Sequence, residues 1–232
     1  IMSLEEIPSK KGTCMTSYDF AISGQHYLFD VQSFAHTILA AGGDAYSYAL
    51  LDRTTQGVID DVASGAAELG VIMQTSTTED ALNSALAEAG LAFHELAVSA
   101  PLVALPASHP FVNAKSLSLE QLADFPYVYF DQGPDAPVAF FEEALSEVPR
   151  AKKVACTDRA SLSELIVALN GYTVTSGILV GITDGSALTT IPLETDIKLH
   201  LGYVTADNRE LSVMGERFVS HLARSLDLYA NR

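Results

Sequence analysis

Short apolar runs alternate with amphipathic stretches from Tyr18 onward, and this alternation predicts strands and helices in turn. In the first half of the chain it predicts strands at 18–23, 45–51, 68–73 and 91–99 and helices at 28–41, 54–64 and 79–89. Strands that alternate with helices are typical of βα units around a largely parallel sheet. The preceding residues 1–12, which contain charged residues, a proline and a glycine, are expected to form a linker or a cloning remnant.

The segment 28–41 has the most regular helical pattern. Its apolar residues follow the helical period of about 3.6 residues; they are Leu28, Val31, Phe34, Ala35, Ile38 and Leu39. The following Gly42-Gly43 is expected to end the helix, because glycine adopts the left-handed backbone conformation of a helix stop without strain.

A second alternation of similar size starts near residue 100. It predicts strands at 101–106, 126–130 and 152–156, helices at 137–147, 158–169 and 209–228, a capped turn from Ser118, and β segments at 172–175, 187–192 and 197–204. Pro137 suits a first helical turn, where its missing N–H costs nothing, and Asn170-Gly171 suits a helix end. Without a Gly/Ser linker between them, the two patterns indicate two lobes joined by a strand, with the last helix returning to the first lobe.

Composition limits the classes of protein to which the chain can belong. Its 232 residues are 48% hydrophobic and 18% charged, as in folded globular proteins. No apolar run reaches the roughly 18 to 20 residues that span a bilayer, and residues 1–12 lack a secretory signal, so we expect no membrane partner and a cytoplasmic location. The net charge of −16 would repel DNA, which proteins bind with Lys and Arg, although it also serves ordinary solubility.

Residues that would carry metal or covalent chemistry are scattered. Cys14 and Cys156 lie far apart, which predicts neither a disulfide nor a zinc site, and Cys156 is expected in the core. The six histidines contain no pair spaced for one helix face. Nucleotide-binding glycine motifs and nucleophile motifs are also missing from the sequence. We therefore expect no metal, no cofactor and no enzymatic activity.

Five segments in this order and spacing resemble the regulatory domain of LysR-type transcription regulators. They are FAISGQHYLFDVQSFAHTI at 20–38, VIDDVASGAAELGVI at 58–72, APLVALPASHPF at 100–111, SLEQLADFPYVYF at 118–130 and LSELIVALNGYTV at 162–174. The resemblance covers residues 18–228. One departure is NGYTVTSGILVGI, which has no proline after the strand, so the path of residues 175–186 stays open.

The resemblance implies an α/β, two-lobed, type 2 periplasmic-binding-protein-like fold in which each lobe is a mainly parallel sheet flanked by helices. Lobe I is then expected at 13–99 and 199–232, and lobe II at 100–198. The family also implies an N-terminal winged helix-turn-helix that contacts DNA, and we expect this element to be absent from this chain. DNA would then be a partner of the full-length protein, bound only through that missing domain.

Loops after strands are the expected ligand contacts, because ligands of open α/β sheets bind at the carboxyl ends of the strands. The first such loop offers a hydroxyl and a close backbone approach at a helix start, through Ser23, Gly24, Gln25 and His26. Two more loops offer Gln74, Thr75, Phe130, Asp131 and Gln132, and the segment after 172–175 offers Thr175, Ser176 and Ile178.

Structural roles are the alternatives for several of these residues. Ser23 would serve as a helix cap, Gln74, Thr75 and Asp131 as turn formers, and His26 as a surface residue at a helix start. For Ser161, a capping box with Glu164 is the preferred interpretation over ligand contact.

We expect a small effector to bind between the lobes and to bias a DNA-binding domain. Helix N-termini and hydroxyls favour an organic acid or an amino acid, although Asp131 would oppose a second negative charge. A solute-binding protein of the same fold is the alternative, followed by a prephenate-dehydratase-like lyase, whose Thr-Arg-Phe motif is absent from the sequence.

The family also implies a homodimer, and a tetramer for the full-length protein. In the dimer, 28–51 would pack against 137–156 of the partner. Surplus apolar surface for this contact is expected from Phe29, Phe34, Phe140 and Phe141.

Overall fold

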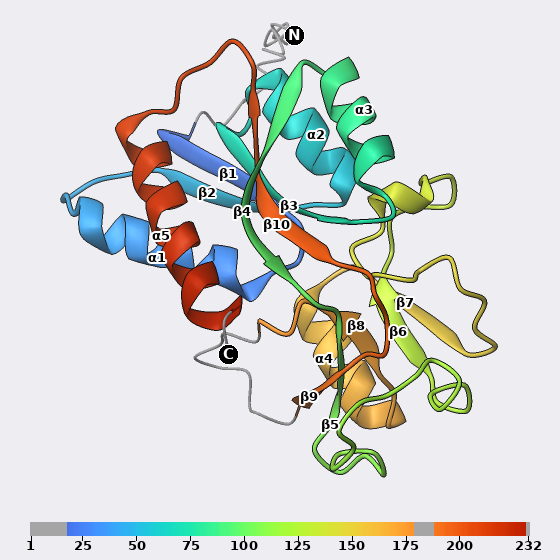
Figure 1. Cartoon of the computed structure of the whole chain (residues 1–232). Coiled ribbons are helices and arrows are strands. Elements are labelled where there is room, and N and C mark those ends of the chain that lie inside the picture. Colours follow the sequence, from blue (N-terminus) through green and yellow to red (C-terminus); the bar gives the residue numbers. More distant parts are fainter. Residues whose placement is uncertain (1–17, 179–187, 231–232) are drawn as a thin grey trace, which may run out of the picture.

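A computed structural model describes residues 18–178 and 188–230, in which two groups of strands lie one above the other (Figure 1). We call the upper group, with its helices, lobe I. Its elements are β1 (Phe20–Gly24), α1 (Leu28–Ala41), β2 (Tyr48–Asp52), α2 (Thr55–Ser64), β3 (Leu69–Thr75), α3 (Glu79–Glu88), β4 (Leu91–Ser99), β10 (Leu199–Ala206) and α5 (Val213–Ala230).

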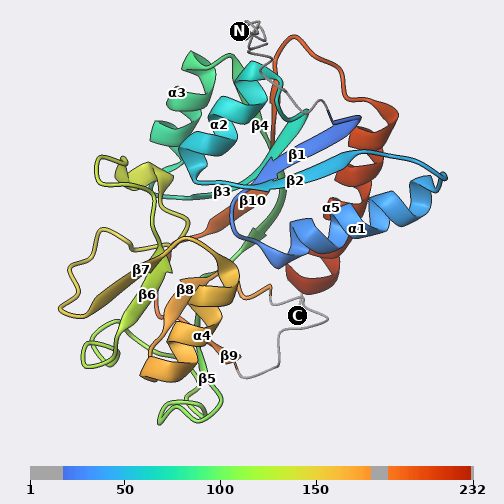
Figure 2. The same ribbon diagram turned by 180° about the vertical axis from the view of Figure 1, so that it is seen from behind.

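Lobe I is a five-stranded sheet in the order β2-β1-β3-β10-β4. Strand β1 runs parallel to β2 and β3, whereas β10 runs antiparallel to β3 and β4. The inner strands FAISG and LGVIMQT are buried along their whole length. This burial follows because α1 and α5 cover one face and α2 and α3 the other, as the two views show (Figures 1 and 2).

Lobe II is the lower group and is less regular. Its elements are β5 (Leu102–Pro106), β6 (Tyr127–Phe130), η1 (Val138–Phe140), β7 (Lys153–Cys156), α4 (Arg159–Leu169), β8 (Thr173–Thr175) and β9 (Leu188–Pro192). Strands β8-β5-β9 form an antiparallel sheet, and β6 pairs with β7 in parallel. The chain crosses between the lobes at two places that lie side by side, since Ser99 pairs with Leu199.

The expected α/β fold is confirmed, but the sheets are mixed instead of mainly parallel. Two strands joined through a helix run parallel, as β1 and β2 do around α1. Strand β10 arrives directly from lobe II without a crossover helix, and it enters the sheet antiparallel to β3. The pattern of helices and strands in the sequence does not indicate the antiparallel direction of this strand.

Most predicted elements are present, with ends that differ by a few residues. The stops are confirmed: Gly42 has a φ of 65°, and Asn170 adopts the left-handed conformation after α4. The expected turn cap at Ser118 is also present, since its hydroxyl accepts from Gln121 N–H at 3.4 Å. The last helix begins at Val213, later than expected.

The predicted helix at 137–147 is wrong. Only Val138–Phe140 forms a helical turn, and Phe141 is already extended, with a ψ of 138°. The two residues that follow, Glu142 and Glu143, accept hydrogen bonds from backbone N–H groups of distant segments. These tertiary contacts outweigh the helical pattern of the local sequence.

The prediction that four phenylalanines give surplus apolar surface is wrong for three of them. Phe29, Phe34 and Phe140 are buried in the core, and the Phe34 ring lies 6.0 Å from that of Phe20. Large exposed apolar side chains do occur elsewhere in the segment 28–51, namely Leu39 and Tyr46.

Candidate functional site

A cavity of about 420 Å³ lies between the lobes. Lobe I contributes the loop before α1, the first turn of α1 and one residue of β3. Lobe II contributes the end of β6, the residues 142–143, the start of α4, the region around β8 and one residue each of β5 and β9. The lining residues are His26, Tyr27, Leu28, Phe29, Met73, Ala104, Phe130, Glu142, Glu143, Arg159, Ala160, Leu162, Ser163, Glu164, Thr173, Val174, Thr175, Ser176, Ile178 and Leu188. Its volume lies within the range of about 300–1,000 Å³ typical of small-molecule sites.

Gln25 fixes the loop between β1 and α1 onto the sheet. Its side-chain Oε1 accepts from Met73 N–H at 2.9 Å and from the Tyr27 hydroxyl at 2.8 Å, and its Nε2 donates to the Thr55 hydroxyl. Gln25 is buried, so these contacts satisfy an amide that would otherwise be costly to bury. The next residue, His26, is thereby held at the lobe interface.

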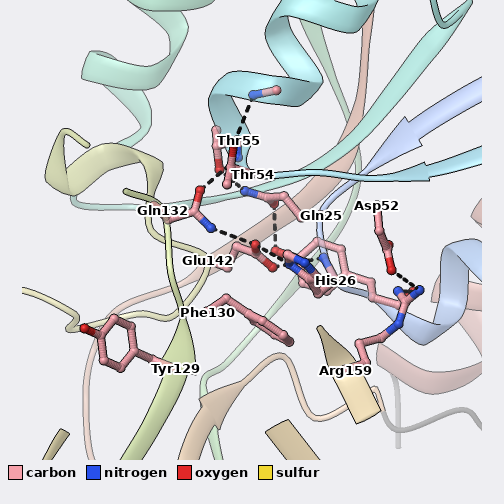
Figure 3. A network of polar contacts seen from close by, with 12 residues as sticks. Gln25, His26, Asp52, Thr54, Thr55, Tyr129, Phe130, Gln132, Glu142 and Arg159 are labelled. Carbon is pink, nitrogen blue, oxygen red and sulfur yellow. Dashed lines mark hydrogen bonds and ion pairs between the residues drawn. The ribbon is translucent and has the colours of Figure 1, made fainter. Parts of the chain in front are cut away.

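A buried set of hydrogen bonds joins the lobes beside the cavity (Figure 3). Glu142 Oε1 accepts from His26 Nδ1 and from Gln132 Nε2, each at 2.8 Å, and Glu142 Oε2 accepts from His26 N–H at 3.0 Å. Gln132 Oε1 in turn accepts from Thr55 N–H at 2.9 Å. We call His26, Thr55, Gln132 and Glu142 the buried junction.

Two further contacts complete the buried junction. The Thr55 hydroxyl donates to the Phe140 carbonyl at 2.6 Å. The His26 ring stacks on Phe130, with centroids 4.1 Å apart. Burial lowers the pKa of His26, but the hydrogen bond and negative charge of Glu142 outweigh it, and the pKa is raised above 6.5.

Arg159 forms a second link between the lobes. Its guanidinium donates to the Tyr27 carbonyl at 2.8 Å and to Asp52 Oδ2 at 2.7 Å, and it lies 3.7 Å from Asp30 Oδ1. Burial raises the pKa of the Asp30 carboxyl well above its ordinary value, and the positive charge of Arg159 works against that rise. We call Arg159, Asp52, Asp30 and the Tyr27 carbonyl the outer junction.

Glu143 lies on the cavity wall beside Glu142. Its Oε1 accepts from Phe130 N–H at 2.8 Å, whereas Oε2 is buried without a hydrogen-bond partner among the described residues. Burial, followed by the negative charge of Glu142, raises the pKa of Glu143 well above its ordinary value. Burial and the neighbouring charge thus disfavour the ionised form of this side chain.

The structure brings seven of the sequence-predicted residues to this region. His26, Phe130, Thr175, Ser176 and Ile178 line the cavity. Gln25 and Gln132 belong to the hydrogen bonds that hold the cavity wall in place.

Five predicted residues lie outside the cavity lining, each with another role. Ser23 donates to Asp61 of α2 at 2.9 Å, and Gly24 ends β1 next to the buried Asp30. The remaining three satisfy local partners: Gln74 donates to Asn83 at 2.6 Å, Thr75 bonds the hydroxyls of Thr77 and Thr78, and Asp131 accepts from Gly133 N–H at 3.0 Å. Ser23 and Gln74 thus contact neighbouring helices, whereas Thr75 and Asp131 make turn contacts.

Sequence reasoning missed Glu142, Glu143 and Arg159. Both glutamates fall within the helix predicted at 137–147, which does not form. Arg159 did carry a signal, because a cation in the first turn of a helix opposes the helix dipole and needs tertiary partners. The cap of that helix is Asp158, which accepts from Ser161 N–H at 2.8 Å, so the expected capping box of Ser161 is wrong.

Clusters of metal-ligating side chains, reactive thiols and membrane-spanning helices are absent from the described part of the chain. No group of three or more His, Cys, Asp or Glu side chains there could hold a metal ion. Burial raises the pKa of the Cys156 thiol to about 11, so it stays protonated. None of the helices of residues 18–178 and 188–230 is long and apolar enough to cross a membrane.

Solved structures with this fold include several regulators. The reduced OxyR regulatory domain from Pseudomonas aeruginosa is similar at a TM-score of 0.61 and 14% identity, over 90% of this chain and 94% of that one. HinK, a LysR family transcriptional regulator from Pseudomonas aeruginosa, is similar at a TM-score of 0.60 and 16% identity, over 89% of this chain and 71% of HinK. No curated protein matches the sequence.

The family model of the LysR substrate binding domain matches residues 47–227, which is more than half of the chain. The expected resemblance is therefore confirmed, and with it the absence of an enzymatic role. The chain belongs to the LysR substrate-binding domain family and is the effector-binding domain of a LysR-type transcription regulator.

Proposed function

We propose that a small effector binds in the cavity between the lobes and changes the arrangement of the lobes. The observation that carries this proposal is the cavity itself, whose wall combines residues of both lobes with the junctions that join them. A ligand shifts a conformational equilibrium only if it binds the two states with different affinity. A ligand that touches both lobes meets this condition, because its contacts change when the lobes move.

We propose further that 13–99 with 199–232 and 100–198 move as the two units, and that their movement is passed to an N-terminal DNA-binding domain in the cytoplasm. The excess of acidic residues supports the view that DNA is contacted by that domain alone, since a net charge of −16 repels phosphates.

Dimerisation through 28–51 and 137–156 of two copies remains a proposal, as does a full-length tetramer. Leu39 and Tyr46 support the first of these surfaces, because both are large exposed apolar side chains in 28–51. Light scattering of the wild type and of Leu39→Glu tests the contact, and an equally monomeric mass for both proteins would contradict it.

Redox sensing is not the function that this chain supports best, although solved OxyR structures are named for oxidised and reduced forms. The thiolate is the reactive form of cysteine. Cys156, the one free cysteine among the described residues, has a pKa of about 11 and is buried. Effector binding in the cavity needs no such reactive group.

A metabolite screen by thermal shift, repeated on a blocked cavity, tests the proposed function. Ser163→Phe places a bulky ring on the cavity side of α4, whereas Val167→Phe adds the same ring at an exposed position of that helix. An effector should raise the melting temperature of the wild type and of Val167→Phe but not of Ser163→Phe. A compound that stabilises all three proteins equally binds outside the cavity and would contradict the proposal.

A further inference from the structure

Acidic side chains outnumber free basic ones in the cavity. Glu142, Glu143 and Glu164 line it, and Arg159 is the one Arg or Lys among the described lining residues. The Arg159 guanidinium already has two oxygen partners in the outer junction. The His26 ring is likewise held by Glu142. An anionic ligand would therefore lie against acidic side chains and find no cation there without a partner among the described lining residues.

Two polar groups on the cavity wall lack partners. Glu143 is 4% exposed and Thr173 is 5% exposed, and neither Glu143 Oε2 nor Thr173 Oγ1 has a hydrogen-bond partner among the described residues. A buried acceptor without a donor costs free energy. Each of these two lining residues thus holds a buried oxygen atom that a ligand with N–H donors would satisfy.

We propose that the effector is a protonated amine on an apolar body, and that its ammonium group binds Glu143 beside Glu142. The inference rests on the proposed effector site and specifies its ligand class. The rest of the lining suits an apolar body, since it includes Leu28, Phe29, Met73, Leu162, Ile178 and Leu188. This class differs from the organic acid or amino acid that the sequence suggested.

The electrostatics of Glu143 agree with this ligand class. Its pKa is raised by burial and by Glu142, while the Phe130 N–H and Arg150 work in the opposite direction. The other titratable groups near it include Tyr27, Tyr127 and Cys156, whose own pKa values the charge of Glu143 helps to raise. An ammonium ion would stabilise the carboxylate and release its proton, so amine affinity should rise with pH and lose that dependence in Glu143→Gln.

Three matched compounds test the inference by isothermal titration of the whole chain: 2-phenylethylamine, 2-phenylethanol and 3-phenylpropionate. The amine should bind most tightly, and Glu143→Gln should weaken it by about tenfold or more, the effect of losing one charge-assisted contact. This variant keeps the oxygen that accepts from Phe130 N–H, so the fold should persist. The alcohol should bind both proteins equally, and Glu147→Gln, an exposed change in the same segment, should bind the amine as the wild type does.

Other results overturn the inference and leave the proposed function distinguishable. If 3-phenylpropionate binds more tightly than the amine and Ser163→Phe abolishes its binding, the cavity is the effector site but the amine class is wrong. If Ser163→Phe leaves amine binding unchanged, the amine binds elsewhere and the inference fails. Absence of binding by all three compounds at millimolar concentration also overturns it, and the metabolite screen then decides on the proposed function alone.

Discussion

The two junctions between the lobes use the same kinds of groups in opposite environments. In the buried junction, the side chains of His26 and Glu142 are only 5% and 2% exposed. In the outer junction, those of Arg159 and Asp52 are 21% and 39% exposed. Both pairs cross from one lobe to the other, and the bond lengths are nearly equal at 2.8 Å and 2.7 Å.

Equal distances therefore do not mean equal energies. Removing one partner of a buried charged pair leaves the other without solvent or a counter-charge, whereas an exposed pair exchanges its partner for water at little cost. The buried junction should set the resting arrangement of the lobes, and the outer junction should adapt when a ligand enters. This difference orders the expected effects of mutation.

Glu142→Ala should have the largest effect on stability. It removes the acceptor of three N–H groups, two from His26 and one from Gln132. We expect the free energy of unfolding to fall by about 3–5 kcal/mol, as for other broken buried ion pairs. Urea unfolding followed by circular dichroism measures the change.

The matched control is Glu147→Ala, five residues along the chain, where the side chain is exposed. A surface change of this kind should stay within about 0.5 kcal/mol of the wild type. Equal losses for the two variants would show that burial does not distinguish the contacts of Glu142.

The sequence predicts lobe I better than lobe II for a physical reason. The helices of lobe I cover a continuous sheet, so their apolar faces repeat with the helical period, and α1, α2 and α3 lie within one residue of their expected bounds. In lobe II the segment from Asp131 to Arg150 is held by side-chain contacts to distant residues, such as those of Glu142 with His26 and of Gln132 with Thr55. Such contacts do not produce a periodic pattern of apolar residues in the sequence.

The same reason separates the site residues that the sequence predicts from those that it misses. Loops after strands are expected to carry ligand contacts, and two residues that this rule selects, His26 and Phe130, lie on the cavity wall. Glu142 reaches the site only because residues 141–143 are extended, and no local pattern indicates this. A glutamate pair between apolar residues looks the same in a solvated helix and in a buried junction.

Thr55→Val should have the next largest effect. It keeps the shape of the side chain but removes a hydroxyl that donates to the Phe140 carbonyl at 2.6 Å and accepts from Gln25. Both partners are then left unsatisfied away from water, which should cost about 1–3 kcal/mol. The same urea titration measures the loss, and a stability equal to the wild type would mean that neither bond contributes to lobe contact.

The stability of the protein should also depend on pH through His26 of the buried junction, with a smaller effect than the two substitutions above. Because the pKa of His26 is raised above 6.5 in the folded state, its contribution is fully present below that pH and is lost as pH rises through the folded value. Glu143 changes stability in the same direction, since its pKa is also raised. The variant His26→Gln keeps the contribution of Glu143. The difference in the free energy of unfolding between wild type and variant therefore isolates the contribution of His26. If this difference in stability were the same at about pH 6 and about pH 9, the raised pKa of His26 would be contradicted.

Asp52→Asn should have the smallest effect, because the outer junction is half open to water. Its carboxylate accepts from Arg159 at 2.7 Å, but Arg159 keeps the Tyr27 carbonyl as a second partner in the variant. We expect a loss of about 0.2–1 kcal/mol at low salt, and a smaller loss in about 1 M salt, where exposed charges are screened. A loss that matches Glu142→Ala and persists in salt would show that the outer junction also fixes the lobes. In that case an effector could enter only by breaking it, and ligand affinity should rise when Asp52 is replaced.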